Sequence, residues 1–288
     1  MLTVFTPTYN RGNMLPRLYR SLCDQTCKDF EWLIIDDGSQ DDTASVVQSF
    51  LKEEKISIRY YKKVNGGKHT AHNLALENAN GEWFFCVDSD DVLALDAVAK
   101  ITKKITENTG EDGIIAYKED LSGRLLSDVF PEGLRKTQIH RLAADYGCEG
   151  EFSLVFATDF ARQFPFPVFD GERFVTECVV YDRMDRRGQF ALLPEVITVC
   201  EYQPDGYSSN LARLMKQSPS GFCLYFMQRI DLQNKLLPCI MHAGKYWCFR
   251  WICKRRELKY EGNHKMLVTL AVIPGMLLRI YYKLVRGI

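Results

Sequence analysis

The sequence predicts an α/β fold in which a mostly parallel mixed sheet is flanked by helices and followed by a C-terminal helical appendage. Over the first hundred residues, short apolar runs typical of buried strands alternate with segments whose apolar residues recur at helical spacing. The connections are short, and repeated strand–helix–strand units form parallel sheets with right-handed crossovers. From about Arg213 the chain is rich in Leu, Met and aromatic residues mixed with Lys and Arg, and we expect helices there.

The expected elements follow one another along the chain. The strands of the first third are residues 2–6, 32–35, 56–61 and 83–87, and the helices between and after them include residues 14–22, 46–51, 70–78 and 98–105. Further strands are expected at 114–118, 152–157 and 191–202, in a less regular stretch that the prolines of 164–167 interrupt. Ligands of such sheets bind beyond the carboxyl ends of the strands. The polar, Gly-containing and acidic segments of this chain fall at those ends.

The net charge of +0 hides an uneven distribution. Residues 213–288 hold 14 Lys and Arg against 3 Asp and Glu, whereas the rest of the chain is acidic. Such a basic tail usually contacts an anionic surface, either a membrane or a nucleic acid. The ten cysteines form no CxxC pair and are typical of buried, reduced thiols in a cytosolic protein. The first strand begins at Leu2, and we expect no signal peptide.

Asp88-Ser89-Asp90 is the sharpest motif in the sequence. Side chains two residues apart on an extended strand point the same way, so Asp88 and Asp90 can converge. Their like charges repel unless a cation lies beside them, and Mg²⁺ or Mn²⁺ favours carboxylate oxygens and bridges to diphosphates. A DxD triplet alone is a weak signal, since most are solvated loops or helix caps. Its place after an apolar strand predicts a metal and diphosphate site.

Polar segments follow the other three strands as well. Asp36 and Asp37 could accept hydrogen bonds from a base or a ribose, although helix capping is an alternative reason for carboxylates there. Asn65-Gly66-Gly67-Lys68-His69 lets the backbone approach a ligand, and Lys68 could reach a phosphate, unless the segment is simply a turn. The first loop, Thr6–Arg11, lacks the GxGxxG of dinucleotide-binding proteins, which disfavours an NAD enzyme. Its Tyr9 could stack on a nucleobase or be an ordinary buried tyrosine.

These residues together resemble the family-2 glycosyltransferases of the GT-A fold, which make bacterial surface polysaccharides among other products. The matching segments are Thr6–Arg11, Gln25-Thr26, Phe30–Ser39, Ala71-His72-Asn73 and Gly81–Asp91, in the family's order. By this resemblance residues 1–212 form the catalytic domain, with a nucleotide-binding half (1–112) and an acceptor half (113–212), and residues 213–288 form the basic helical region.

The resemblance also implies roles for single residues. Pro7, Tyr9 and Asp37 would line the base site, Lys68 and Asn73 would lie near the ribose and phosphates, Asp88 would face the nucleotide sugar and the metal, and Asp90 would be the principal ligand of Mn²⁺ or Mg²⁺. The residues expected to bind the nucleotide sugar also include the neighbouring Thr8, Arg11, Asp36 and Ser89. Many relatives have Arg where this chain has His72, which weakens a phosphate role for that position at neutral pH.

The family's catalytic base comes from an acidic motif, often Glu-Asp, in the later half of the domain. The best match here is Glu177-Cys178, which departs from the pattern at its second position. Glu177 is therefore the expected base and Asp182 the reserve, while a salt-bridged structural role for Glu177 is the alternative. The segment 201–210 resembles the loop that closes over the diphosphate in relatives, and Ser208 and Ser209 are suitable donors.

The resemblance implies an inverting transfer of a sugar from a nucleotide-diphosphate donor, UDP more than GDP, to a glycan or lipid-linked acceptor. Two other classes remain open: a nucleotide-sugar-binding protein without turnover, which Cys178 favours and the intact DxD disfavours, and a sugar-1-phosphate nucleotidyltransferase. The latter normally has a Gly-rich basic loop after the first strand, which Thr6–Tyr9 is not.

The tail carries an uncharged, mostly apolar run at 266–278 that is too short for a bilayer span of about 20 residues. Basic residues lie on both sides of it, Lys254-Arg255-Arg256 before and Arg279, Lys283 and Arg286 after. We expect peripheral contact with the cytoplasmic face of an anionic cell membrane, where lipid-linked acceptors are found. A terminal helix packed on the catalytic domain is the alternative. No nucleic-acid-binding motif is recognised, so no nucleic acid partner is expected.

Overall fold

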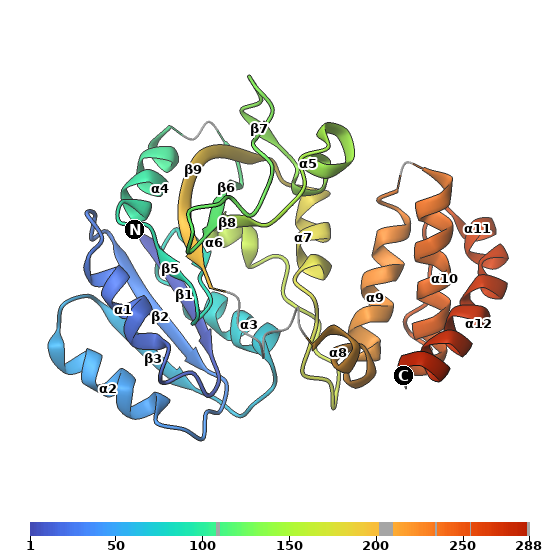
Figure 1. Ribbon diagram of the computed structural model, residues 1–288, viewed down its shortest axis with the longest axis horizontal. Coiled ribbons are helices and arrows are strands. Elements are labelled where there is room, and N and C mark those ends of the chain that lie inside the picture. The colour runs from blue at the N-terminus through green and yellow to red at the C-terminus, as the bar shows by residue number, and fades with distance from the viewer. Residues whose placement is uncertain (108–109, 202–209, 234, 254, 287–288) are drawn as a thin grey trace. The chain divides into compact units, whose positions relative to one another are not determined.

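The computed structural model describes residues 1–107, 110–201, 210–233, 235–253 and 255–286 (Figure 1). The chain divides into two compact units. The first comprises Met1–Pro165 and Arg183–Gln203, and the second comprises Phe166–Asp182 and Pro204–Ile288.

The first unit is built on one mixed sheet with the strand order β3-β2-β1-β4-β8-β6-β9-β5, and β7 pairs with β9 off this path. Its strands are β1 (Leu2–Thr8), β2 (Phe30–Asp36), β3 (Ile58–Lys62), β4 (Trp83–Cys86), β5 (Val92–Leu93), β6 (Gly113–Asp120), β7 (Lys136–Thr137), β8 (Phe152–Ala157) and β9 (Phe190–Cys200). Strands β3, β2, β1 and β4 are parallel, as the sequence predicts, and β8 is antiparallel to both of its neighbours.

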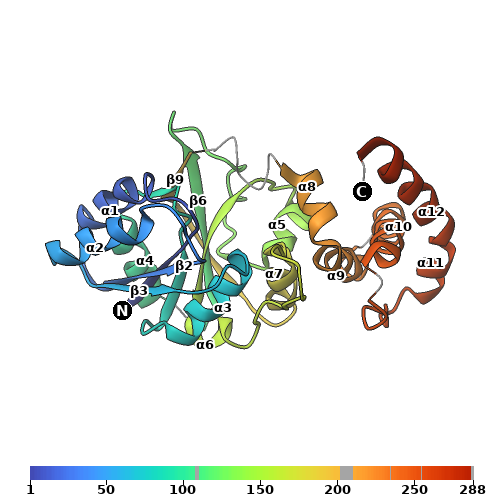
Figure 2. The same cartoon turned by 90° about the horizontal axis from the view of Figure 1, so that it is seen from below.

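Helices cover both faces of this sheet (Figure 2). They are α1 (Leu15–Cys23), α2 (Thr43–Glu53), α3 (Lys68–Asn78), α4 (Ala97–Thr106), α5 (Ile139–Tyr146) and α6 (Thr158–Ala161). Successive side chains of a strand point to opposite faces. Val4 and Trp32 therefore join the core formed with α1, α2 and α4, whereas Phe5 contacts Phe84 and His72 of α3 on the other face.

Strand β1 runs two residues further than the sequence predicts, through Pro7 to Thr8. Pro7 lacks a backbone N–H and is tolerated only where a strand has a free side. The pairing of β1 with β4 ends at Phe5, whereas the pairing with β2 continues to Thr8, so Pro7 lies beyond the two-sided part of the ladder. The short elements β5, β7, α5 and α6 were not predicted, because runs of two to eight residues carry little periodicity.

The second unit is helical, with its own core. It contains α8 (Leu211–Gln217), α9 (Pro219–Ile230), α10 (Leu236–Cys253), α11 (Lys265–Leu270), α12 (Val272–Tyr281), a π-helical turn (Tyr282–Arg286) and the first residues of α7 (Cys178–Asp185). The rings of Phe222, Phe226 and Phe249 pack against one another at tilted angles in this core and come from α9 and α10. Within the described part of the chain, no helix has the length and apolarity needed to span a membrane.

Segment 166–182 belongs to the second unit because two acids fasten it to α9. The carboxylate of Glu172 accepts hydrogen bonds from the backbone N–H groups of Ser220 (2.9 Å) and Gly221 (3.1 Å), which cap the first turn of α9. Asp182 forms a buried ion pair with Arg229 near the end of the same helix (2.8 Å). These packing units differ from the functional domain boundaries predicted above, which stay a prediction.

The start of β1 and the turn before β4 approach so closely that Gly81 cannot carry a side chain. A Cβ at this position would lie 2.5 Å from the backbone nitrogen of Thr3. We therefore expect Gly81→Ala to lower the free energy of unfolding by about 1–3 kcal/mol, measured by urea denaturation. Glu77→Ala, on an exposed position of α3, is the control and should change it by less than about 0.5 kcal/mol. Equal stability of both variants would contradict the tight approach.

Candidate active site

The strands of the first unit deliver their polar loops to one edge of the sheet. β1, β2, β3 and β4 are parallel, so Thr8, Asp36, Lys62 and Cys86 end at the same side. β8 is antiparallel to both β4 and β6, and β9 is parallel to β6, so the carboxyl ends of β6 and β9 lie there too. The expected convergence of strand-end motifs is therefore present.

Asp88 lies beyond the end of β4 and is held by Lys68, the first residue of α3. The Nζ atom of Lys68 is 2.6 Å from one carboxylate oxygen of Asp88 and 2.8 Å from the other. Burial opposes the charged form of Asp88, but the Lys68 ammonium outweighs it and holds the pKa below its usual value. The sequence placed Lys68 near a phosphate. In the structure, the ammonium group of Lys68 forms an ion pair with Asp88, the first acid of the DxD motif.

Asp90 and Asp91 share this acidic end of the strand. Burial and the charge of Asp88 raise the pKa of Asp90. Burial raises the pKa of Asp91 to about 7, together with the Asp88 charge, while Lys118 of β6 partly offsets the shift. Ser89 is buried between the two acids of the motif. Three neighbouring carboxyl groups thus lie where their negative charge is unfavourable without a cation.

Asp37 organises the loop between β3 and α3. Its carboxylate accepts hydrogen bonds from the backbone N–H groups of Gly66 (2.9 Å) and Gly67 (2.7 Å) and from Lys63 (2.6 Å). Gly67 has φ +94°, which only glycine adopts readily. Asp37 therefore fixes the segment that begins α3 and carries Lys68. The sequence-based role at the base site stays a prediction.

Asp36 is buried and satisfied within the protein. One carboxylate oxygen accepts the backbone N–H of Ser39 (2.7 Å) and the other accepts the hydroxyl of Tyr60 (2.6 Å). Helix capping, the alternative weighed for this motif, is performed by Asp41, whose carboxylate accepts the N–H of Thr43 at the start of α2 (3.1 Å). The local geometry therefore gives Asp36 a structural position at the end of β2.

The loop after β1 combines buried and exposed side chains. Thr8 is buried, whereas Tyr9 is 45% exposed and available to stack on a planar ligand. Asn10 has φ +52° and holds the turn by donating its N–H to Ser39 (2.9 Å) and accepting that of Gln40 (2.8 Å). The charge of Arg11 favours the ionised forms of both DxD acids: it adds to the lowering of the Asp88 pKa and offsets part of the rise in the Asp90 pKa.

His72 and Asn73, two adjacent polar residues of α3, differ in burial. His72 contacts the rings of Phe5 and Phe84, and burial together with the Lys68 charge lowers its pKa to about 3. It is therefore neutral and embedded in the core at neutral pH, which agrees with the doubt about a phosphate role. Asn73, the next residue, is half-buried.

The expected catalytic acids, Glu177 and Asp182, both belong to the second unit. Glu177 is half-buried, and its backbone carbonyl accepts the N–H groups of Val180 and Tyr181 at the start of α7. The reserve acid, Asp182, is buried in its ion pair with Arg229, whose guanidinium also lies over the ring of Tyr225. Its surroundings are those of a structural anchor. Ser208 and Ser209 lie outside the described residues.

A bound divalent ion would find few protein ligands here. Within the described residues, no group of three or more His, Cys, Asp or Glu side chains is arranged to hold a metal ion. Lys68 already pairs with Asp88, which leaves Asp90 and Asp91 as the carboxylates whose negative charge is disfavoured. Mg²⁺ and Mn²⁺ bound with a nucleotide commonly use one or two carboxylates and take their other ligands from phosphates and water. The residues fit an ion of that kind, shared with a diphosphate.

Three cationic residues of the site were not found from the sequence. Lys63 binds Asp37 and also donates to Thr70 (2.7 Å). Lys118 lies near Asp88 and Asp91, and Arg17 of α1 donates to the carbonyl of Asp90 and pairs with Glu201. Each comes from a different element, and only the fold brings it to the acids. No local sequence signal could have identified them.

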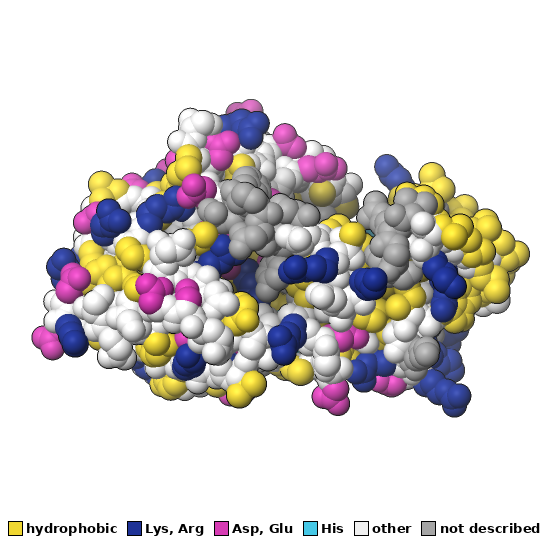
Figure 3. All heavy atoms as spheres, turned by 60° about the horizontal axis from the view of Figure 1, so that its bottom comes forward, with side chains coloured by type: hydrophobic (Ala, Val, Ile, Leu, Met, Phe, Trp, Pro, Cys, Tyr) yellow, Lys and Arg dark blue, Asp and Glu magenta, His cyan; other side chains and the backbone are white. Residues whose placement is uncertain are grey.

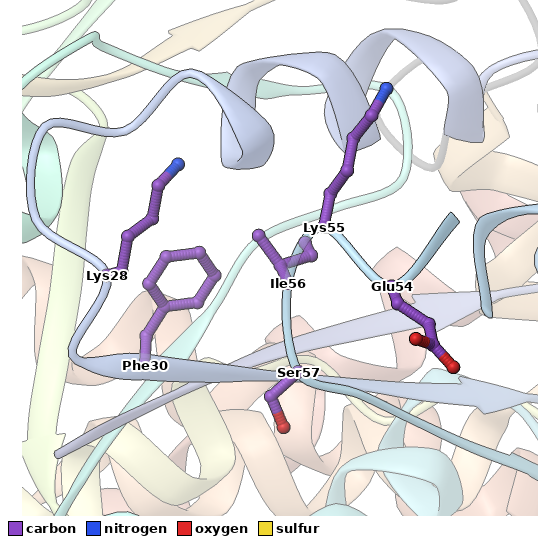
Figure 4. Close-up of a pocket in the computed structure, with 6 residues that line it drawn as sticks. All are labelled: Lys28, Phe30, Glu54, Lys55, Ile56 and Ser57. Atoms are coloured by element: carbon purple, nitrogen blue, oxygen red, sulfur yellow. The ribbon is translucent and has the colours of Figure 1, made fainter. Parts of the chain in front are cut away.

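A cavity of about 240 Å³ lies away from these acids (Figure 4). Phe30 opens β2 and Ser57 precedes β3, so it is at the amino ends of those strands, where Lys28, Phe30, Lys55 and Ile56 point to one side. It contains no cluster of acids or nucleophiles, and we assign it no part in the site.

The sheet and its acidic edge define a GT-A glycosyltransferase fold. Among solved structures, TarS of Staphylococcus aureus in complex with UDP-GlcNAc superposes with a TM-score of 0.64 at 16% identity, over 98% of this chain and 91% of the other. Glucosyl-3-phosphoglycerate synthase of Mycobacterium tuberculosis, with Mn²⁺ and UDP-glucose, gives 0.52 at 15% identity over 79% of each chain.

Residues 3–138, just under half of the chain, match the model of glycosyl transferase family 2. A curated relative, the GalNAc(5)-diNAcBac-PP-undecaprenol beta-1,3-glucosyltransferase of Campylobacter jejuni, is 36% identical over 163 residues, which cover 54% of this chain and 51% of the relative. Matches to the first curated relatives span between 17% and 51% of their lengths. The predicted family and fold are thus confirmed.

Because Asp37 positions the loop that carries Lys68, its removal should weaken the fold locally and not only the site. We expect Asp37→Asn to lower the free energy of unfolding by about 2–4 kcal/mol, since all three hydrogen bonds lose the carboxylate charge and one of the two acceptor oxygens is replaced by a donor. Asp42→Asn is the matched control, because Asp42 is exposed and makes no capping bond. Urea denaturation of both variants is the measurement, and an unaltered midpoint for Asp37→Asn would contradict this role.

Proposed function

We propose that the protein is a metal-dependent glycosyltransferase that transfers a sugar from a nucleotide-diphosphate donor to an acceptor hydroxyl. The observation that carries the proposal is the acidic cluster of Asp88, Asp90 and Asp91 at the strand-end edge of a family-2 domain, with Lys68 paired to Asp88. Donor complexes of proteins with this fold support it, since UDP-GlcNAc is bound by TarS and UDP-glucose with Mn²⁺ by the mycobacterial synthase.

Asp90, with Asp88 beside it, would hold the divalent ion, Mn²⁺ or Mg²⁺. When bound, such an ion stabilises the negative charge that develops on a departing diphosphate. Lys68 and Arg11 add positive charge near the same acids, and Tyr9 offers an exposed ring for the base. UDP is the nucleotide proposed, on the basis of the two uridine-nucleotide complexes named above.

Glu177 is proposed as the general base that takes the proton from the acceptor hydroxyl, so that the hydroxyl oxygen attacks the anomeric carbon as the diphosphate leaves from the opposite face. This displacement inverts the anomeric configuration. Of the acids near the Glu177-Cys178 motif, Glu172 caps α9 and Asp182 pairs with Arg229, so both have structural partners. Asp182 remains the reserve, but its burial disfavours it as a proton acceptor.

The acceptor is proposed to be a glycan or a lipid-linked sugar of bacterial polysaccharide synthesis, reached at the cytoplasmic face of the cell membrane. The Campylobacter relative, named as a glucosyltransferase for an undecaprenol-linked glycan, supports this class of acceptor. The basic C-terminal region supports peripheral contact with the membrane, and no nucleic acid is invoked.

Asp90→Asn should abolish sugar transfer and the metal-dependent protection by UDP together, since both need the same carboxylate. The measurement is thermal unfolding with a panel of nucleotide sugars with and without Mn²⁺, alongside donor turnover. Asp96→Asn is the control, because Asp96 is a half-exposed surface acid that pairs with Lys100. Full protection of Asp90→Asn by UDP and Mn²⁺ would contradict the proposed metal site. If the wild-type protein binds the donor but does not turn it over, the result would favour a nucleotide-sugar-binding protein.

Glu177→Gln should leave donor binding intact and lower the transfer rate by about 10²–10⁴-fold, the usual contribution of general-base catalysis. Asp182→Asn should instead lower the free energy of unfolding by about 3 kcal/mol, because it leaves the largely buried guanidinium of Arg229 without its counter-ion. Transfer kinetics and urea denaturation of both variants separate the two roles. Near-normal transfer by Glu177→Gln would remove this residue from the mechanism.

A further inference from the structure

An apolar, exposed face runs along α11, α12 and the π-helical turn that follows them. Six large side chains recur at alternating intervals of four and three residues: Met266, Leu270, Ile273, Leu277, Ile280 and Leu284. Their exposed fractions lie between 56% and 78%. This spacing places them on one side of a helix, and we call this set the apolar stripe. Figure 3 shows hydrophobic side chains gathered at this end of the second unit.

The opposite face of the same helices is also apolar, but it is buried. Val268, Ala271 and Tyr282 belong to the core of the second unit. Gly275 of α12 meets Gly244 and Trp247 of α10 so closely that a Cβ would lie 2.6 Å from the Cβ of Trp247. Packing on α10 therefore fixes the orientation of α12. The buried face of the helix covers the core of the second unit, and the exposed stripe has no part in covering it.

The charges near the stripe have one sign. The last acidic residue of the chain is Glu261, and Lys265, Arg279, Lys283 and Arg286 follow it. Lys265, Arg279 and Lys283 are exposed, and Lys and Arg side chains border the apolar surface in Figure 3. An apolar face with these exposed cations beside it complements a surface that offers hydrocarbon beneath anionic head groups.

A second copy of the chain is a poorer occupant of this face. A symmetric contact between two stripes would bring Lys265, Arg279 and Lys283 near their own copies, and like charges across an interface oppose association. The helices are also too short to cross a bilayer, since α11 and α12 together run only from Lys265 to Tyr281. Helices that lie in the plane of the membrane surface do not have to span the bilayer, and their cations can contact the anionic head groups.

We propose that the apolar stripe of α11–α12 inserts into the interfacial layer of an anionic bilayer, with Lys265, Arg279 and Lys283 contacting the lipid head groups. This assigns the membrane contact proposed above to one defined surface. It rests on the second unit alone and is tested by lipid binding, so its failure and the failure of the glycosyltransferase proposal are distinguishable.

The experiment is flotation of the full chain with vesicles of phosphatidylcholine containing roughly one-third phosphatidylglycerol, and with phosphatidylcholine alone. We expect the wild type to float with the anionic vesicles and to be released by high salt, which screens surface charge. The variant Ile273→Gln/Leu277→Gln/Ile280→Gln should bind these vesicles at least roughly tenfold more weakly, because three large side chains lose their contact with hydrocarbon. Arg279→Glu/Lys283→Glu should show a comparable loss.

The matched control is Leu95→Gln/Leu121→Gln/Val129→Gln, which removes three exposed apolar side chains from the first unit and should float like the wild type. Thermal unfolding curves establish that each variant is folded, and donor turnover in detergent-free buffer should be unchanged in all of them. Equal flotation of the wild type and the stripe variant would overturn the proposal. So would a wild type that binds no vesicles and forms a dimer which the stripe variant cannot form.

Discussion

The ion pair between Lys68 and Asp88 makes the acidic edge of the sheet possible. Three carboxyl groups follow β4 within four residues, and their mutual repulsion would disfavour the compact loop if no cation lay among them. Lys68 reaches both oxygens of Asp88 because α3 begins at that residue, and α3 begins there because Asp37 binds the backbone of Gly66 and Gly67. The neutralisation of the acids that follow β4 thus depends on the carboxylate of Asp37, directly after β2.

This arrangement also explains why a site with so many acids can receive an anionic ligand. Lys63, Lys68, Lys118 and Arg17 each contact or lie near an acid of this edge, so the positive charge is already in place but largely engaged. A diphosphate that arrives with a divalent ion would bring both signs of charge. Its phosphates would pair with the cations of these ion pairs, and the metal would pair with the carboxylates. Asp90 and Asp91, whose negative charges are disfavoured by burial and by Asp88, would gain from that exchange.

The sequence was sufficient for the features that are local or periodic. Apolar runs predicted the strands β1 to β4, and the strand-end position of the DxD motif predicted the acidic edge, because a parallel sheet collects the carboxyl ends of its strands. It was insufficient for features that depend on contacts between distant elements. Arg17 and Lys118 have no motif of their own, Asp36 and Asp37 have identical chemistry but different partners, and the role of Asp182 depends on Arg229, 47 positions further along the chain.

The division of the chain gives the two proposals a common structural basis. Glu172 and Asp182 fasten the segment around Glu177 to α9, so the proposed base is carried by the helical unit and not by the sheet. The residues proposed for the donor and the metal all belong to the sheet unit. The helical unit also bears the apolar stripe, on α11 and α12. The proposed base and the proposed membrane-contacting surface thus belong to the same unit.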